Sequence, residues 1–386
     1  MLKACDWTFP VPIRYGPGRL AELGDVCAAA GLKNPLIVTD RGSRALPFVA
    51  DAGRALEGAG LSSGLFAEVS PNPTDREVAA GKAAWLSGKH DGVVALGGGS
   101  GMDAGKAISL VARNNHQLWD FDFDVAPPVI AAPAGLAPLV CVPSTAGTGA
   151  ETESTAMITD TRRGIKGCVW HPRQKPLAAI LDPAITVGLP KNLTAWTGCD
   201  ALVHAIEAYC VPAWHPMCDG IALEAMGLIH PWLARAVAAP DDLEARGAML
   251  AGSCLAGVSF LKGLGLVHAI SHMVGARYDS HHGLTNAVLL PAVLRYNAGA
   301  IAGKIPALCW AMGLEGSDFA TLYGAVTGLL DDFDIPKNLA ALGVETAAAA
   351  DIAAKAFADA ATTTNPAPAS IADIERLIID AIAKAR

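Results

Sequence analysis

The chain has 386 residues, of which 52% are hydrophobic and 17% charged, and its formal net charge is −8. This composition excludes a disordered protein, and the lack of any Lys/Arg run argues against nucleic acid or an anionic membrane as partner. Residues 247–261 form an uncharged stretch, but a membrane-spanning helix needs about 20 apolar residues. The N-terminus lacks an apolar signal segment, and nine scattered cysteines suit reduced thiols, so we expect a cytoplasmic protein.

The first half of the chain alternates apolar runs with helix-like segments. The predicted strands are residues 36–40, 65–69, 92–96, 139–142, 155–160 and 178–182. Helical periodicity appears between them, for example over residues 41–58 and 75–87. Because continuous apolar strands that alternate with helices are typical of parallel sheets, we predict a Rossmann-like α/β nucleotide-binding domain over residues 1–185.

The second half of the chain has a helical pattern nearly to its end. Predicted helices cover residues 192–209, 218–237, 244–261 and 370–384. Asp182-Pro183 and Leu189-Pro190 mark the change of pattern. We therefore predict an all-helical domain over residues 186–386.

A glycine-rich turn follows the strand predicted over residues 92–96. It reads Gly97-Gly-Gly-Ser-Gly-Met-Asp-Ala-Gly-Lys106. Glycines let the backbone approach a pyrophosphate, and the N-terminus of the next helix offers free N–H groups. A tight βα turn without a ligand explains this segment alone almost as well. Asp40, at the end of an earlier strand, is placed to accept from ribose hydroxyls and to repel a 2′-phosphate, which favours NAD over NADP.

Histidines and a carboxylate recur at helical spacing in the second half. Asp200 and His204 are four residues apart, and His268 and His272 repeat this spacing shortly before the pair 281–282. An i,i+4 spacing places both side chains on one helix face. A single such histidine is usually a packed core residue, but five of the ten histidines lie here. The cluster favours a divalent ion with nitrogen and oxygen ligands, either Fe²⁺, Zn²⁺ or Mn²⁺.

With these motifs, the chain resembles the iron-containing (group III) alcohol dehydrogenases, which have a dehydroquinate-synthase-like fold. The resemblance covers nearly the whole length. Its motifs are the turn at residues 97–106, the segment Pro143-Ser-Thr-Ala-Gly-Thr148, residues 198–209, and residues 263–275 with His282-Gly283. It implies hydride transfer between NAD(H) and a small primary alcohol or aldehyde, in homodimers or larger homo-oligomers.

The resemblance also implies roles for individual residues. The implied metal ligands are Asp200, His204, His268 and His282, with Fe²⁺ as the expected ion and Zn²⁺ as an alternative. The implied catalytic residues are His272, which relays the hydroxyl proton, and Asp103, near the nicotinamide. The implied cofactor-binding residues are Asp40, Asn72, Gly98, Gly99, Ser100, Asp103, Thr145, Thr148 and Lys166.

The substrate is less constrained by the sequence than the reaction. Lys262, Arg277 and His281 lie within 20 residues of one another on an acidic chain, so a pocket for an anionic aldehyde, such as a semialdehyde acid, is one hypothesis. Helix capping or surface ion pairing is the simpler interpretation of the same residues. Two alternatives of function stay open: a hydroxyacid–oxoacid transhydrogenase with tightly held NAD, and a glycerol-dehydrogenase-like polyol oxidoreductase.

Overall fold

The computed structural model describes residues 5–7, 10–131 and 135–384 of the chain. These residues form two compact units. The first comprises Met1–Thr145, Ala150–Leu189 and Asp241–Leu250, and the second comprises Ala146–Gly149, Pro190–Pro240 and Ala251–Arg386. The main change of unit therefore falls after Leu189, four residues beyond the predicted limit. Two short segments belong to a different unit from the residues that flank them: Ala146–Gly149 is in the second unit and Asp241–Leu250 is in the first.

The first unit is built on a seven-stranded sheet in the order β1-β2-β9-β6-β5-β3-β4. All neighbouring strands are parallel except β1 and β2. The strands are β1 (Cys5–Trp7), β2 (Ile13–Tyr15), β3 (Leu36–Asp40), β4 (Gly64–Val69), β5 (Val93–Gly97), β6 (Leu139–Pro143) and β9 (Ala178–Leu181). The predicted parallel α/β fold is confirmed.

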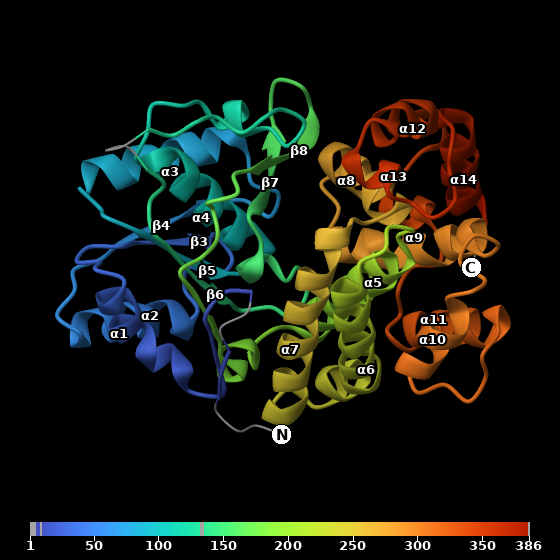
Figure 1. Ribbon diagram of the computed structural model, residues 1–386, viewed down its shortest axis with the longest axis horizontal. Helices are drawn as coiled ribbons and strands as arrows, with labels where there is room; N and C mark the ends of the chain where they lie inside the picture. The colour runs from blue at the N-terminus through green and yellow to red at the C-terminus, as the bar shows by residue number, and fades with distance from the viewer. Residues whose placement is uncertain (1–4, 8–9, 132–134, 385–386) are drawn as a thin grey trace. The chain divides into compact units, whose positions relative to one another are not determined.

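Helices cover both faces of this sheet (Figure 1). They are α1 (Leu23–Ala29) and α2 (Pro47–Gly58) on one face, and α3 (Asp75–Ser87) and α4 (Gly99–Ala112) on the other. Alternate residues of β5 enter the two resulting cores: Val93 and Ala95 pack with α3 and α4, and Val94 and Leu96 with α1 and α2. Burial on both faces explains why the strands read as continuous apolar runs.

A separate β-hairpin accompanies the large sheet. Strand β7 (Thr155–Asp160), predicted from its apolar run, pairs antiparallel with β8 (Ile165–Trp170) and not with the parallel strands. The sequence analysis did not predict β8. Only Val169 of that strand is buried, so its residues lack the apolar run that marked the other strands.

All regular elements of the second unit, within the described residues, are helices. They are α5 (Lys191–Cys210), α6 (Pro216–Ala238), α8 (Leu266–Tyr278), α9 (His282–Asn297), α10 (Ile305–Ala311), α11 (Phe319–Asp332), α12 (Ala349–Phe357), α13 (Ala360–Thr363), α14 (Ile371–Ala383) and short 3-10 turns. The helix α7 (Leu243–Ser259) contributes residues to both units. The predicted helical second half is confirmed.

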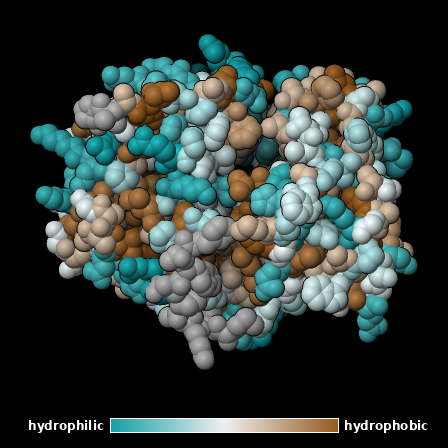
Figure 2. Space-filling model, in the orientation of Figure 1, coloured by the Kyte–Doolittle hydropathy of each residue, from teal (hydrophilic) through white to brown (hydrophobic). Residues whose placement is uncertain are grey.

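The face shown in Figure 2 mixes hydrophilic and hydrophobic residues. Val129, Trp214 and Trp310 are the most exposed large apolar side chains described, at 91%, 89% and 77%. Single exposed apolar residues are normal on soluble proteins. Among the described helices, none alone is long and apolar enough to span a membrane. One pair, bent by 105°, meets that test only when its two helices are taken together.

Candidate metal centre and cofactor turn

Helix α5 supplies three acidic or imidazole side chains to the interior of the second unit. Asp200, His204 and Glu207 recur at spacings of four and three, so they share one helix face. All three are buried, with Asp200 only 2% exposed. Such polar groups are stable inside a helical bundle only when they bind one another, other polar groups or an ion.

Helices α8 and α9 bring the other imidazoles to the same place. His268 lies in the first turn of α8, and His282 is the first residue of α9. The backbone before α8 passes through Gly265, where a Cβ would lie 2.7 Å from the carboxylate of Glu207. Any side chain at this position would have to displace the Glu207 carboxylate, so glycine allows α8 to start close to α5.

Four potential ligands converge: Asp200, His204, His268 and His282 each offer one atom, and these atoms all lie within 4.8 Å of one another. The Oδ1 atom of Asp200 is 4.0 Å from Nε2 of His204, 3.9 Å from Nε2 of His268 and 3.7 Å from Nε2 of His282. Ligands that are each about 2.1 Å from one ion lie about 3–4 Å apart. The spacing of these atoms therefore fits a single divalent ion.

The side-chain amide of Asn286 shows where their lone pairs point. Its Nδ2 lies 2.7 Å from Oδ1 of Asp200, 3.2 Å from Nε2 of His268 and 3.1 Å from Nε2 of His282. Three acceptors thus face one point from different helices. The Oδ1 of Asn286 is buried without a hydrogen-bond partner in the described part of the chain. This donor set, one carboxylate and three imidazoles, suits Fe²⁺ or Zn²⁺.

Burial keeps one of the imidazoles neutral. Desolvation lowers the pKa of His204 to about 4, although the carboxylate of Asp200 opposes that shift. At neutral pH its ring is therefore uncharged, which is the form that coordinates a metal.

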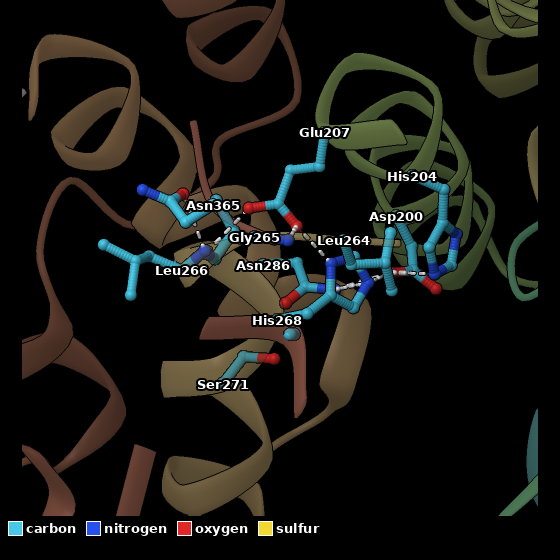
Figure 3. Close-up of polar contacts among 12 residues, drawn as sticks. Asp200, His204, Glu207, Leu264, Gly265, Leu266, His268, Ser271, Asn286 and Asn365 are labelled. Atoms are coloured by element: carbon cyan, nitrogen blue, oxygen red, sulfur yellow. Dashed lines mark hydrogen bonds and ion pairs between the residues drawn. The ribbon is translucent and has the colours of Figure 1, made fainter. Parts of the chain in front are cut away.

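Further polar residues orient two of the imidazoles, those of His268 and His282. Figure 3 shows Glu207 beside His268. Oε2 of Glu207 lies 2.6 Å from Nδ1 of His268, and the same carboxylate accepts from the backbone N–H groups of Gly265 and Val267. The Ser271 hydroxyl lies 3.2 Å from Nδ1 of His282. With Nδ1 engaged in these two rings, Nε2 is the nitrogen that each leaves for an ion.

His272 lies beside this cluster and is not one of the four converging side chains. Its ring stacks on that of His282, with centroids 5.5 Å apart and an interplanar angle of 11°. Its Nδ1 lies 2.9 Å from Oδ2 of Asp359. His272 is therefore adjacent to one of the four converging side chains.

In the first unit, the glycine-rich turn joins β5 to α4. Gly97 has φ of +143°, which favours glycine, and Gly98 is the N-cap of α4. A Cβ on Gly105 would lie 2.6 Å from the Cβ of Ala95, so α4 packs closely on the sheet. The turn thereby presents the N-terminus of α4, with Gly99 and Ser100 in its first turn, at the carboxyl ends of the strands.

Other predicted cofactor residues, Asp40, Asn72 and Lys166, lie in the same unit as this turn. Asp40 ends β3, and its carboxylate accepts from the backbone N–H and the hydroxyl of Ser43, at 2.9 and 2.8 Å. A Cβ on Gly97 would lie 3.1 Å from Oδ2 of Asp40. Nζ of Lys166 lies 3.5 Å from Oδ1 of Asn72. Asp40 therefore adjoins the turn, and Asn72 and Lys166 form a pair.

Asp103 lies one turn into α4. Burial raises the pKa of its carboxyl to about 6, although Lys106, Lys166 and the backbone N–H of Met157 oppose this shift. The electrostatic interaction with Lys166 shows that Asp103 lies near this predicted cofactor residue.

The segment after β6 is divided between the units. Thr145 ends a first-unit segment, and a Cβ on Gly98 would lie 3.4 Å from Cγ2 of Thr145. Thr148 belongs to the second unit, in Ala146–Gly149. Thr145 therefore adjoins the glycine turn within its own unit.

The three candidate substrate cations have different partners in the structure. Nζ of Lys262 is buried against the carboxylate of Asp219 and the carbonyl of Tyr209. The exposed Arg277 pairs with Asp351 at 3.0 Å. His281 caps α9, its Nδ1 accepting from the Leu284 backbone, and its ring packs on Trp196. The simpler interpretation, capping and ion pairing, describes these residues.

Four polar residues of the centre were not identified from the sequence: Glu207, Ser271, Asn286 and Asp359. Glu207 carried a usable signal, since it lies three residues after His204 on the same helix. Asn286 lies four residues after His282, again on one helix face. Asp359 is 87 residues from His272 and follows no motif.

A parallel sheet with a dinucleotide-type turn, together with a largely buried Asp/His₃ centre, is the combination expected of a metal-dependent dehydrogenase. The sequence profile of the iron-containing alcohol dehydrogenases matches residues 10–183, and that of the C-terminal part of the Fe-containing alcohol dehydrogenase family matches residues 194–382. The chain belongs to the iron-containing alcohol dehydrogenase family.

Known relatives span the chain. An NAD-dependent methanol dehydrogenase of Bacillus methanolicus is 37% identical over 95% of this chain and 97% of its own. A 4-hydroxybutyrate dehydrogenase of Cupriavidus necator is 37% identical over 94% and 95%. A crystal structure of a 1,3-propanediol oxidoreductase matches with a TM-score of 0.90 and 34% identity, covering 99% of this chain and 100% of that one.

Proposed function

We propose that this protein is an NAD(H)-dependent, metal-dependent alcohol dehydrogenase that interconverts a short primary alcohol and its aldehyde. The observation that carries the proposal is the convergence of Asp200, His204, His268 and His282 on one point. The second support is the glycine turn before α4, with Asp40 beside it. The names of the relatives, an NAD-dependent methanol dehydrogenase among them, agree with both.

The residues of the chain have distinct tasks in this reaction. The N-terminus of α4 binds the pyrophosphate, and the Asp40 carboxylate accepts from the adenosine ribose hydroxyls. Asp200 and the three imidazoles would hold a divalent ion, which would supply Lewis-acid chemistry toward the substrate oxygen. Bound nicotinamide supplies the hydride chemistry. His272, adjacent to the ligand His282, accepts the hydroxyl proton of the alcohol.

We propose a neutral substrate, in preference to the anionic aldehyde considered from the sequence. Lys262 and Arg277, the two permanent cations of that hypothesis, are engaged with Asp219 and Asp351. Relatives named for methanol and 1,3-propanediol act on neutral primary alcohols, and the 4-hydroxybutyrate enzyme is named for an acidic one. Because the relatives include both kinds of substrate, neutral and acidic aldehydes must be compared by experiment.

We also propose a cytoplasmic homo-oligomer. The thiols of Cys27, Cys141 and Cys210 are buried, and burial raises the pKa of each to about 12, so they stay protonated. Unreactive thiols suit a reducing compartment. The high hydrophobic content, 52%, supports an additional interface between copies of the chain.

The test is anaerobic NADH oxidation by protein reloaded with Fe²⁺ or with Zn²⁺, using propanal, lactaldehyde and succinic semialdehyde in parallel. We expect turnover of propanal and lactaldehyde with at least one of the ions. His268→Ala should lose both the bound metal, measured by elemental analysis, and the turnover. Wild-type turnover in metal-free protein would contradict the proposal.

The alternatives give different results in the same assay. Preference for succinic semialdehyde would restore the anionic substrate. Absence of NADH oxidation, combined with NAD that stays bound through gel filtration, would identify a transhydrogenase. Oxidation of glycerol in preference to primary alcohols would indicate a polyol oxidoreductase.

A further inference from the structure

We infer that Asp359 is a positioning residue that fixes the tautomer of His272, so that Nε2 of His272 carries the lone pair that accepts the substrate proton. The inference rests on the proposed function, because it assigns a task to His272 in that reaction. Asp359 comes from the short connection between α12 and α13, far in sequence from α8.

The two side chains form a largely buried pair. Their side chains are 10% and 11% exposed, and Nδ1 of His272 lies 2.9 Å from Oδ2 of Asp359. The carboxyl is ionised at neutral pH: burial acts to raise the pKa of Asp359, but the contact with His272 and the backbone N–H of Ala361 bring it below its usual value. An ionised carboxylate only accepts, so Nδ1 must carry the hydrogen.

The other oxygen of the same carboxylate is held by the backbone. Asp359 is the N-cap of α13, and its Oδ1 accepts from the N–H of Ala361 at 2.9 Å. This bond sets the plane of the carboxylate and directs Oδ2 to His272. The helix cap therefore determines the orientation of the imidazole as well as the start of α13.

With Nδ1 engaged, Nε2 is the remaining nitrogen of His272. No hydrogen bond to it comes from the described residues. The ring is also held parallel to that of His282, one of the four converging side chains. In alcohol oxidation the substrate O–H bond breaks, its proton forms a new bond to Nε2, and the two electrons of the C–H bond leave with the hydride to nicotinamide. With the other tautomer, Nε2 already carries hydrogen and cannot accept.

The variant that tests the inference is Asp359→Asn, because the cap dictates how the new amide must orient. The Ala361 N–H requires an oxygen, so the amide oxygen takes the place of Oδ1 and the NH₂ group faces His272. An amide donor forces Nδ1 to accept and moves the ring hydrogen to Nε2. Asparagine is also a good N-cap, so α13 is retained.

Asp318→Asn is the matched control. Asp318 caps α11 and accepts from the N–H of Thr321 at 2.8 Å, and no imidazole contact is recorded for it among the described residues. This variant makes the same chemical change at a helix N-terminus without altering the tautomer of His272. We expect its turnover and metal content to equal those of the wild type.

Two readouts are needed. In the Zn²⁺-loaded protein with ¹⁵N-labelled histidine, NMR reports which nitrogen of His272 carries hydrogen, with the signal assigned by its loss in His272→Gln. We expect Nδ1–H in the wild type and Nε2–H in Asp359→Asn. We expect kcat for alcohol oxidation to fall about 100-fold or more, with unchanged metal content and nearly unchanged KM.

Each result decides the inference. An unchanged tautomer in Asp359→Asn overturns it, as does a changed tautomer with wild-type kcat. If Asp359→Asn does not fold, Asp359→Ser retains a capping hydroxyl too short to reach the ring, and a wild-type kcat in that variant likewise overturns it. Failure of the proposed function looks different: the wild type itself then lacks turnover, while the tautomer measurement still reports the hydrogen bond.

Discussion

The Nδ1 atom of His268 lies 2.6 Å from Oε2 of Glu207, and both side chains are buried. Glu207 also accepts from the N–H groups of Gly265 and Val267, at 3.1 and 2.8 Å. One carboxylate thus fixes both the start of α8 and the ring of the ligand that α8 carries. The metal centre depends on a residue that is not itself among the four converging ligands.

Replacing Glu207 by Gln should weaken metal binding without removing a ligand. The amide keeps the size of the side chain but lacks the charge that holds Nδ1–H of His268. Loss of such an outer-shell partner typically reduces metal affinity about 10- to 100-fold. The measurement is residual metal after dialysis against graded chelator concentrations. Glu224→Gln, an exposed change on α6, is the control, and equal metal retention in the two variants would contradict the role of Glu207.

Lys262→Met should destabilise the protein without changing its aldehyde preference. Lys262 and Lys304 both donate to the carbonyl of Tyr209, near the C-terminus of α5, and the Lys262 side chain is only 1% exposed. Removal of this ammonium leaves the Asp219 carboxylate without its ion-pair partner, while Lys304 still donates to the Tyr209 carbonyl. We expect a loss of about 1–3 kcal/mol in the free energy of unfolding. Urea unfolding gives the change in the free energy of unfolding.

The control for this variant is Arg277→Met. The Arg277–Asp351 pair is about half exposed on both sides, 48% and 46%, and exposed pairs contribute less than about 1 kcal/mol. A selective rise in KM for succinic semialdehyde over propanal in Lys262→Met would instead return Lys262 to the substrate site.

Asp103→Asn should raise the free energy of unfolding at high pH and leave that free energy unchanged at low pH. Burial raises the pKa of Asp103 from its ordinary value of 3.8 to about 6. Near pH 4 the Asp103 carboxyl of the folded protein is protonated, so its burial carries no charge penalty. Above pH 6 the same carboxyl is ionised, and its charge is less well solvated in the folded protein than in the unfolded chain. Stability contributed by this group is therefore lost as pH rises through the interval from 4 to 6.

Partial exposure of Asp103 limits the gain of the Asn variant at pH 8 to on the order of 1–2 kcal/mol. Urea unfolding of both proteins at pH 4.5 and pH 8 measures it. A difference that is the same at both pH values would show that the carboxyl is not perturbed. We also expect weaker turnover in this variant, because Asp103 adjoins the predicted cofactor residue Lys166.

Gly257→Ala adds only one methyl group but should destabilise the protein strongly. A Cβ at Gly257, on α7, would lie 2.6 Å from the carbonyl oxygen of Gly149 and 2.7 Å from its Cα. Both are main-chain atoms that cannot rotate away, and overpacking of this kind costs about 1–3 kcal/mol or more. A Cβ at Gly220, on α6, would have no atom within 4 Å. Gly220→Ala should therefore raise the free energy of unfolding by up to about 1 kcal/mol, because alanine has the higher helix propensity. Thermal unfolding of both variants separates the two effects, and similar melting temperatures would refute the close approach.

Much of the fold was accessible from local patterns. The strands β3, β5 and β6 are buried on both faces, so their sequences are continuous apolar runs that predict strands without knowledge of their neighbours. Of the hairpin β7–β8, only β7 is predicted from the sequence. Strand β8 is mostly half-buried, so buried and exposed residues do not alternate clearly along it. The pairing of β7 away from the parallel sheet depends on long-range contacts that no local pattern encodes.

For the site, local sequence patterns specify the chemistry of the groups and their placement along single helices. The spacing of Asp200 and His204 and the glycine turn before α4 are local features, because helical periodicity and φ preferences act over a few residues. That α5, α8 and α9 meet, so that four side chains converge, follows from long-range packing of the helices. The tertiary structure alone pairs His272 with Asp359 and Lys262 with Asp219, since contacts across scores of residues arise from packing.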